Sequence, residues 1–376
     1  MQFPFISLFL SPTLTSIEVY LKSNANARKL WNFLHLSTPA LQKLTVIPDG
    51  FIASTATQAA FSRALPSWQD LTSLKLPDNV PISIDDLITL SRCDKLRTLY
   101  IAPECNPVSS LDSQFTSENY FLSLQDLHLH ISSTNILLRI ADMIKAIRSH
   151  GFKSFTLDIE SPYTSVELNR ILGAVAMHRQ LNILRMSLEN RSSIRLESGE
   201  DSDMLVTSAT IEPIFHLTDL VEFRMEQFYL QPTKELLDKM ARAWPKIKVL
   251  ECSCRRSATT NHFLTSTVDI SDLQILAEFC PNLETLSIPF SSTLHKDVSD
   301  LPVRRTSGIA LFLDVGECRI DNPVTTAIYL TCLFPQVTVL SFSHILIEQQ
   351  LRDALEVVNR ARAQERRYGS VGEVSK

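Results

Sequence analysis

A group of side chains that could do chemistry lies near the middle of the chain. Asp126, His128 and His130 alternate along one predicted strand and so share one face, and Asp158 lies on the same face of the next predicted strand. Imidazole and carboxylate groups placed in this way could bind a metal, or form a His-Asp base beside a serine or threonine hydroxyl of the second strand. Such a site would be open to water, whereas catalytic sites are usually concave pockets. We therefore expect no enzymatic activity, no catalytic residue, no cofactor and no resident metal.

The strands that carry these residues belong to a pattern that recurs along the whole chain. Its unit is three apolar residues at positions 1, 4 and 6, as in the segment 283–288. Nine of the eleven steps between successive triples measure 25 to 30 residues, and the two longer steps indicate loop insertions. The triples begin at Leu14, Leu41, Leu71, Leu96, Leu124, Phe152, Leu181, Leu220, Ile247, Leu283, Ala310 and Val337.

Prolines mark where several of these strands begin. A proline cannot continue a helix and biases the preceding residue towards extended geometry, so a proline in constant phase with the triples predicts a helix-to-strand junction. Apolar residues between the triples follow helical spacing, most clearly over 135–147 and 165–177, so each unit is predicted to be one strand and one helix. The prolines two residues before a triple are Pro12, Pro39, Pro245, Pro281 and Pro335.

A period in the high twenties, with one strand and one helix per unit, predicts an α/β leucine-rich-repeat solenoid of about twelve irregular repeats. We expect a curved molecule, with parallel strands on its concave face and helices on its convex face. The solenoid is predicted over 1–344, with loop insertions at about 190–210 and 255–267. A capping helix over 345–367 and a disordered tail over 368–376 complete the chain.

Two repeats near the end of the solenoid require a choice of register. In the weak repeat we predict a strand over 312–315 with Leu313 and Val315 pointing inward, because the other register would bury the carboxylate of Asp314 without a partner. In the last repeat the triple predicts that Leu340 and Phe342 point inward, which leaves Val339 on the opposite face.

Composition argues against several classes of protein. The formal net charge is -5, whereas nucleic-acid-binding domains are usually basic, so we expect no nucleic-acid partner. The chain contains no apolar run of 18 residues, so we expect no membrane span. Its 8 glycines form no phosphate-binding loop. Its 7 cysteines form no disulfide framework, which favours a reducing compartment, the cytoplasm or nucleus. We expect a monomer.

The partner-binding surface is predicted from strand geometry. Residues at the third, fifth and seventh positions from the start of each triple face the concave side, and charge concentrates there in the middle of the chain. We expect this surface to bind a protein partner, although exposed strand positions are also polar simply because they are solvated. Its candidate residues are Asp126, His128, His130, Asp158, Arg185, Glu222, Arg224, Glu226 and Glu251.

The junctions over 38–46 and 334–340 resemble the repeats of F-box/leucine-rich-repeat proteins, and the opening segment 8–14 is similar to the expanded families of mushroom-forming fungi. The resemblance implies a ubiquitin-ligase substrate receptor, in which an F-box binds the Skp1 adaptor and the repeats bind the substrate. The triples begin at Leu14, which leaves no room for an F-box, so the resemblance covers the substrate-recognition arm. A Skp1-type adaptor is expected only if an F-box is encoded upstream. The alternative is a repeat scaffold unrelated to ubiquitination.

Overall fold

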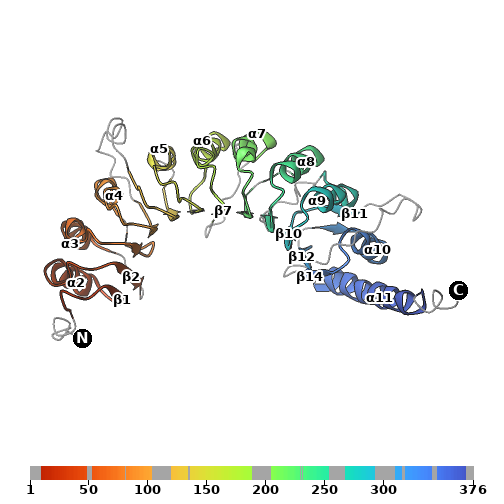
Figure 1. The fold of residues 1–376 in the computed structure, drawn as a ribbon, viewed down its shortest axis with the longest axis horizontal. Coiled ribbons are helices and arrows are strands. Elements are labelled where there is room, and N and C mark those ends of the chain that lie inside the picture. Colours follow the sequence, from red (N-terminus) through yellow and green to blue (C-terminus); the bar gives the residue numbers. More distant parts are fainter. Residues whose placement is uncertain are drawn as a thin grey trace. The chain divides into compact units, whose positions relative to one another are not determined.

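The computed structural model describes residues 10–48, 53–80, 82–103, 120–133, 136–188, 205–228, 230, 232–253, 267–292, 310–315, 318–340 and 345–369. The chain divides into two compact units, Met1–Leu196 and Glu197–Lys376, and the boundary falls inside the predicted insertion at 190–210. Each unit is an α/β repeat in which strands and helices alternate along the chain (Figure 1).

In the described part of the first unit, seven parallel strands form a sheet in sequence order, β1-β2-β3-β4-β5-β6-β7. Its strands lie along one side and its helices along the other (Figure 1). The strands are β1 Ser16–Leu21, β2 Lys43–Pro48, β3 Ser73–Lys75, β4 Thr98–Ile101, β5 Asp126–Ile131, β6 Ser154–Ile159 and β7 Ile183–Leu188. The helices are α2 Asn24–Ser37, α3 Thr55–Ala64, η1 Leu65–Ser67, α4 Ile84–Ser91, α5 Leu137–Ala146 and α6 Ser165–Val175.

The second unit has the same plan in its described segments, with a parallel sheet in the order β8-β9-β10-β12-β14 and a separate two-stranded ladder, β11-β13. The strands are β8 Glu222–Glu226, β9 Val249–Ser253, β10 Thr285–Ser287, β11 Ser291–Ser292, β12 Leu311–Asp314, β13 Arg319–Ile320 and β14 Val337–Leu340. The helices are α7 Ser208–Ile211, η4 Glu212–His216, α8 Lys234–Ala243, η5 Ile270–Asp272, α9 Leu273–Phe279, α10 Pro323–Leu333 and α11 Ile345–Gly369.

Four helices end immediately before the prolines that the repeat pattern singles out. The C-cap residues of α2, α8, α9 and α10 each precede a proline, and each has a positive ψ of 62° to 88°, outside the helical range. Because the proline ring disfavours helical geometry at the residue before it, the chain leaves the helix there and enters the next strand. These C-cap residues are Thr38, Trp244, Cys280 and Phe334.

The core of each unit is a ladder of apolar side chains that runs across its strands, as predicted. In the first unit, Leu127 lies opposite Phe155, which lies opposite Leu184. In the second unit, Phe223 lies opposite Leu250, which continues through β10 to β12. These five side chains are at most 1% exposed. Each repeat buries its apolar face only by stacking on its neighbours, which is the principle of a leucine-rich-repeat solenoid.

The weak repeat has the register predicted for it, and the last repeat does not. In β12, Leu313 is buried, whereas Phe312 is exposed and Asp314 half-buried on the other face. In β14, Val339 lies opposite Leu313 and is only 2% exposed, so the prediction that Val339 points outward is wrong by one residue. Residues 337, 339 and 340 are all apolar, so the triple alone did not distinguish the two registers. The β-branched side chain of Val339 continues the ladder.

The predicted insertions, cap and tail lie partly outside the described residues. Residues 205–210 are ordered, with Val206 bridged to Leu230 and α7 beginning at Ser208, so the end of the first insertion is not a loop. Of the second insertion, 255–266 lies outside the described range. The capping helix α11 reaches Gly369, two residues into the predicted tail, and 370–376 lies outside. No helix within the described segments is long and apolar enough to cross a membrane.

Candidate functional site

The histidines of β5 lie on the face of the first unit's sheet that points away from the helices. Leu127, Leu129 and Ile131 of β5 are buried, so strand alternation places His128 and His130 on the opposite face. On β6, Asp158 lies directly opposite His130 and diagonally opposite His128. We name this side of each sheet, away from the helices, the open face.

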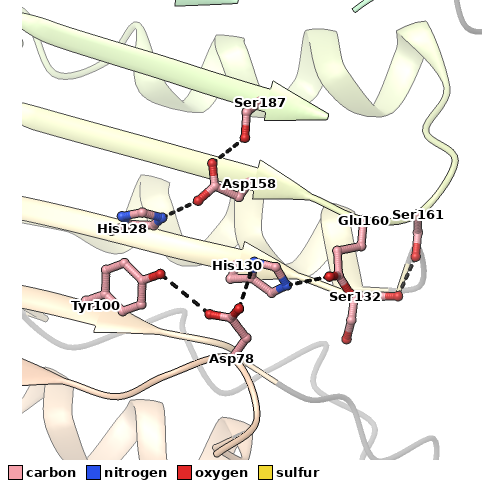
Figure 2. Close-up of polar contacts among 9 residues, drawn as sticks. All are labelled: Asp78, Tyr100, His128, His130, Ser132, Asp158, Glu160, Ser161 and Ser187. Atoms are coloured by element: carbon pink, nitrogen blue, oxygen red, sulfur yellow. Dashed lines mark hydrogen bonds and ion pairs between the residues drawn. The ribbon is translucent and has the colours of Figure 1, made fainter. Parts of the chain in front are cut away.

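A hydrogen-bonded chain joins three strands on this face (Figure 2). Nε2 of His128 contacts Oδ2 of Asp158, and the Ser187 hydroxyl of β7 donates to Oδ1 of Asp158 at 2.5 Å. On its other side the His128 ring packs against the ring of Tyr100 on β4, with centroids 4.0 Å apart. Asp158 therefore holds both neighbouring side chains in place.

Opposing influences act on the pKa of Asp158. Partial burial alone would raise it, because burial disfavours the carboxylate. The hydrogen bonds from His128 and Ser187, with the nearby charges of His128 and His130, outweigh burial and lower this pKa below its ordinary value. The ionised carboxylate is thus the stable form at neutral pH.

His130 is buried rather than exposed, which corrects its prediction as a partner-binding residue. Its side chain is only 3% exposed and lies between two carboxylates (Figure 2). Nδ1 is 3.9 Å from Oδ2 of Asp78, and Nε2 is 3.4 Å from Oε1 of Glu160. Strand alternation predicts the face of His130 correctly, but Asp78 and Glu160, which follow β3 and β6, cover its side chain. His130 therefore lies beneath the exposed surface and is not part of it.

Two other predicted residues of the first unit are exposed as expected. Asp126 begins β5 and lies opposite Thr98 and Ser154. Arg185 lies on β7 opposite Thr156. The structure thus joins His128 to Asp158, places His130 opposite Asp158 but in contact with Asp78 and Glu160, and places Asp126 one row earlier along β5.

In the second unit, a charged cluster lies on the open face of β8 and β9. The guanidinium of Arg224 donates from Nε to Oε1 of Glu222 at 2.5 Å and from Nη1 to Oε2 of Glu251 at 2.7 Å. Glu226 lies two residues further along β8. The Arg224 side chain is 33% exposed, and its two carboxylate partners hold it against the sheet.

The Glu251 carboxyl group is surrounded by more negative than positive charge. Its pKa is raised, first by burial and then by Glu226, with Asp314 and Glu222 adding to the effect and Arg224 opposing it. Asp314 comes from β12, where the Ser287 hydroxyl of β10 donates to its Oδ2 at 3.0 Å. Among the described residues of this face, one guanidinium therefore does not balance the carboxylates.

The chain is similar in structure to a chain in a crystal structure of the yeast Rad7 and Elc1 complex. The TM-score is 0.40 and the sequence identity 14%, over 80% of this chain and 68% of that chain. No family model matches this chain, and no curated protein matches it.

The hydrogen bonds of the first network have the wrong connectivity for an activated nucleophile. A serine nucleophile gives its proton to a histidine, but Ser187 donates to the carboxylate of Asp158. Burial raises the pKa of the Cys280 thiol to about 12, so this thiol stays protonated at neutral pH. Within the described part of the chain, no group of three His, Cys, Asp or Glu side chains is placed to hold a metal ion.

Several residues of these networks lay outside the sequence prediction. Asp78 and Glu160 lie just after β3 and β6, beyond the third, fifth and seventh positions that the strand rule considers. Tyr100 occupies the fifth position of its repeat, but the prediction was confined to charged and histidine residues. A rule that included aromatic residues at the fifth position, and polar residues one or two places past the seventh position, would have found all three.

Proposed function

We propose that the chain is a non-enzymatic protein-interaction module that binds a protein partner through the open faces of its parallel sheets. One observation carries this proposal: each unit buries its apolar side chains between sheet and helices, and leaves rows of polar, charged and aromatic side chains on the opposite face. Parallel strands in register set these rows side by side, about 4.8 Å apart. Such a surface suits the side chains of a folded or extended protein.

The hydrogen bonding supports a binding role over catalysis. Asp158 is hydrogen-bonded to both His128 and Ser187, and Arg224 is hydrogen-bonded to both Glu222 and Glu251. Paired groups of this kind hold their rotamers, so the surface presents a fixed pattern of charge. Complementary charge sets association rate and rejects wrong partners more than it adds raw affinity.

We further propose that this module is the recognition arm of an F-box-type ubiquitin-ligase receptor. The support is the resemblance of its repeat junctions, in which the helix ends at Thr38 or Phe334 immediately before a proline. On this proposal a Skp1-type adaptor binds only through an F-box encoded upstream of Met1. Sequencing the transcript upstream of Met1 tests this point, and a transcript without an F-box favours the scaffold alternative.

Charge-reversal variants on the two sides of the repeats test the binding role. The open-face variant combines Asp126→Arg with Arg185→Glu, and the helix-side control combines Arg148→Glu with Glu278→Arg. All four side chains are exposed, and neither pair changes the net charge. The tagged chains are recovered from an extract of the native source, and co-purified proteins are quantified by mass spectrometry.

We expect the unaltered chain and the helix-side control to recover the same main partner, and the open-face variant to recover about tenfold less, since like charges at an interface oppose association. Equal recovery by all three chains would refute binding through the first unit's open face. Matching circular dichroism spectra of the three proteins show that the repeats remain folded.

A further inference from the structure

We infer that the open face of the second unit binds a basic segment of a partner protein, with arginine or lysine side chains against its carboxylates and an apolar residue against Phe312. This inference rests on the proposed function and names the chemistry of the partner. It concerns the face formed by β8, β9, β10, β12 and β14.

The first support is the charge balance on this face. Among its described residues, four carboxylates share one guanidinium, that of Arg224, which already contacts two of them. Because opposite charges attract and like charges repel, a surface with this excess favours a cationic partner. The carboxylates belong to Glu222, Glu226, Glu251 and Asp314.

Elsewhere in the second unit, several basic side chains each pair with one carboxylate. At the edge where the strands begin, Lys246 pairs with Asp219 and Lys248 with Glu284. On the helix side, Arg242 pairs with Asp238. In these pairs one cation faces one carboxylate, whereas on the open face Arg224 contacts two carboxylates. The raised pKa of Glu251 agrees, because burial and then Glu226 disfavour its ionised form despite the contact with Arg224.

The second support is an exposed aromatic side chain on the same face. Phe312 of β12 is 41% exposed and lies in a row between Thr285 and Thr338. Its neighbours in the chain, Leu311 and Leu313, are buried, so the core is complete without it. Aromatic side chains are enriched in the centres of protein interfaces, where they contact apolar groups of the partner. Phe312 therefore supplies an apolar contact within a polar, acidic surface.

Strand spacing sets the shape of the segment. From β8 to β12 the sheet has three strand intervals, because the order is β8-β9-β10-β12. At about 4.8 Å per interval these two strands lie about 14 Å apart, which an extended chain covers in about four residues. The register places Phe312 in the row of Glu222, so Glu226 lies four residues, or about 13 Å, further along the strands. A segment that crosses the sheet diagonally, over about 20 Å, thus fits best with a basic residue near Glu226 and an apolar residue about six positions away, near Phe312.

Peptide selection with the full chain tests this inference. A displayed library of random twelve-residue peptides is selected on the unaltered protein, and the affinities of the selected peptides are measured by fluorescence anisotropy. One variant, Glu226→Gln with Asp314→Asn, removes two charges from the open face. A matched control, Glu235→Gln with Glu278→Gln, removes two exposed charges from the helix side. A third variant, Phe312→Thr, gives Phe312 the residue type of its neighbours in the row.

We expect the selected peptides to be basic and to carry an apolar residue. The open-face charge variant should bind them about tenfold more weakly at low salt, with a smaller difference at high salt, because salt screens the charges. Phe312→Thr should also weaken binding, and the helix-side control should not. Selection of neutral or acidic peptides, the absence of any binding peptide, or equal affinity for all variants would overturn the inference.

One outcome separates this inference from the function on which it rests. If Asp126→Arg with Arg185→Glu reduces partner recovery, but the selected peptides bind the second unit's variants unchanged, the chain is an interaction module with a different partner chemistry. In that case the proposed function stands and the inference about the basic segment fails.

Discussion

Replacing Leu127 by alanine tests the ladder that holds the repeats of the first unit together. The side chain is 1% exposed and lies between Leu99 and Phe155 on the neighbouring strands. Truncation to alanine removes three carbons, which corresponds to about 2.4 kcal/mol of transfer free energy at about 0.8 kcal/mol per methylene. The cavity adds to this loss, and buried leucine-to-alanine changes usually cost about 2–5 kcal/mol in total. We therefore expect the free energy of unfolding to fall by about 3–4 kcal/mol.

The matched control is Asp126→Ala, one residue earlier on β5 and exposed on the opposite face. It should change the free energy of unfolding by less than about 0.5 kcal/mol, as is usual for exposed positions. Urea unfolding followed by circular dichroism gives both values, and amide hydrogen exchange should show the greatest loss of protection in β4, β5 and β6, because a repeat contacts mainly its neighbours. A loss below about 1 kcal/mol for Leu127→Ala, or equal losses for both variants, would refute this account of the ladder.

Three further predictions follow from individual environments. Burial lowers the pKa of His178, and Arg148 adds to this effect. The stability that this residue contributes is therefore complete above the ordinary histidine pKa and declines as the pH falls through it. Chemical denaturation from pH 7.5 to 5.5 should show a smaller loss of stability for His178→Gln than for the unaltered chain. The raised pKa of Glu251 means that the folded state disfavours its carboxylate at neutral pH, so Glu251→Gln should increase the free energy of unfolding at pH 7, and a clear decrease would contradict this. Leu313→Ala should destabilise the second unit by about 2–5 kcal/mol in urea unfolding, whereas Phe312→Thr should cost far less, because only Leu313 lies in the core; similar losses would refute the register of β12.

The sequence was most informative about features that recur in every repeat. Buried ladder residues such as Leu127 and Leu250 could be predicted because period-two alternation repeats at nearly constant spacing. Helix ends such as Cys280 could be predicted because proline restricts the residue before it. The same rules gave the wrong register in β14, where adjacent apolar residues satisfy either alternation and only the pairing of Val339 with β12 decides.

The chemistry of the open face was less predictable because it depends on contacts between repeats. Strand alternation places His130 on that face, but its burial results from Asp78 and Glu160, which belong to other repeats. Likewise the charge of Arg224 is visible in the sequence, but its hydrogen bond to Glu251 depends on the register of β8 with β9. Side-chain pairing across strands therefore has to come from the structure.

Hydroxyl-radical footprinting of the chain, alone and with its co-purified partner, tests binding through the open faces most directly. Oxidisable side chains occur on both sides: Tyr100 and Phe312 lie on the open faces, whereas Phe33 and Met177 are exposed away from them, at 40% and 59%. Partner binding should lower the oxidation rate of Tyr100 or Phe312 and leave Phe33 and Met177 unchanged. Protection of Phe33 or Met177, with unchanged oxidation of Tyr100 and Phe312, would contradict binding through the open faces.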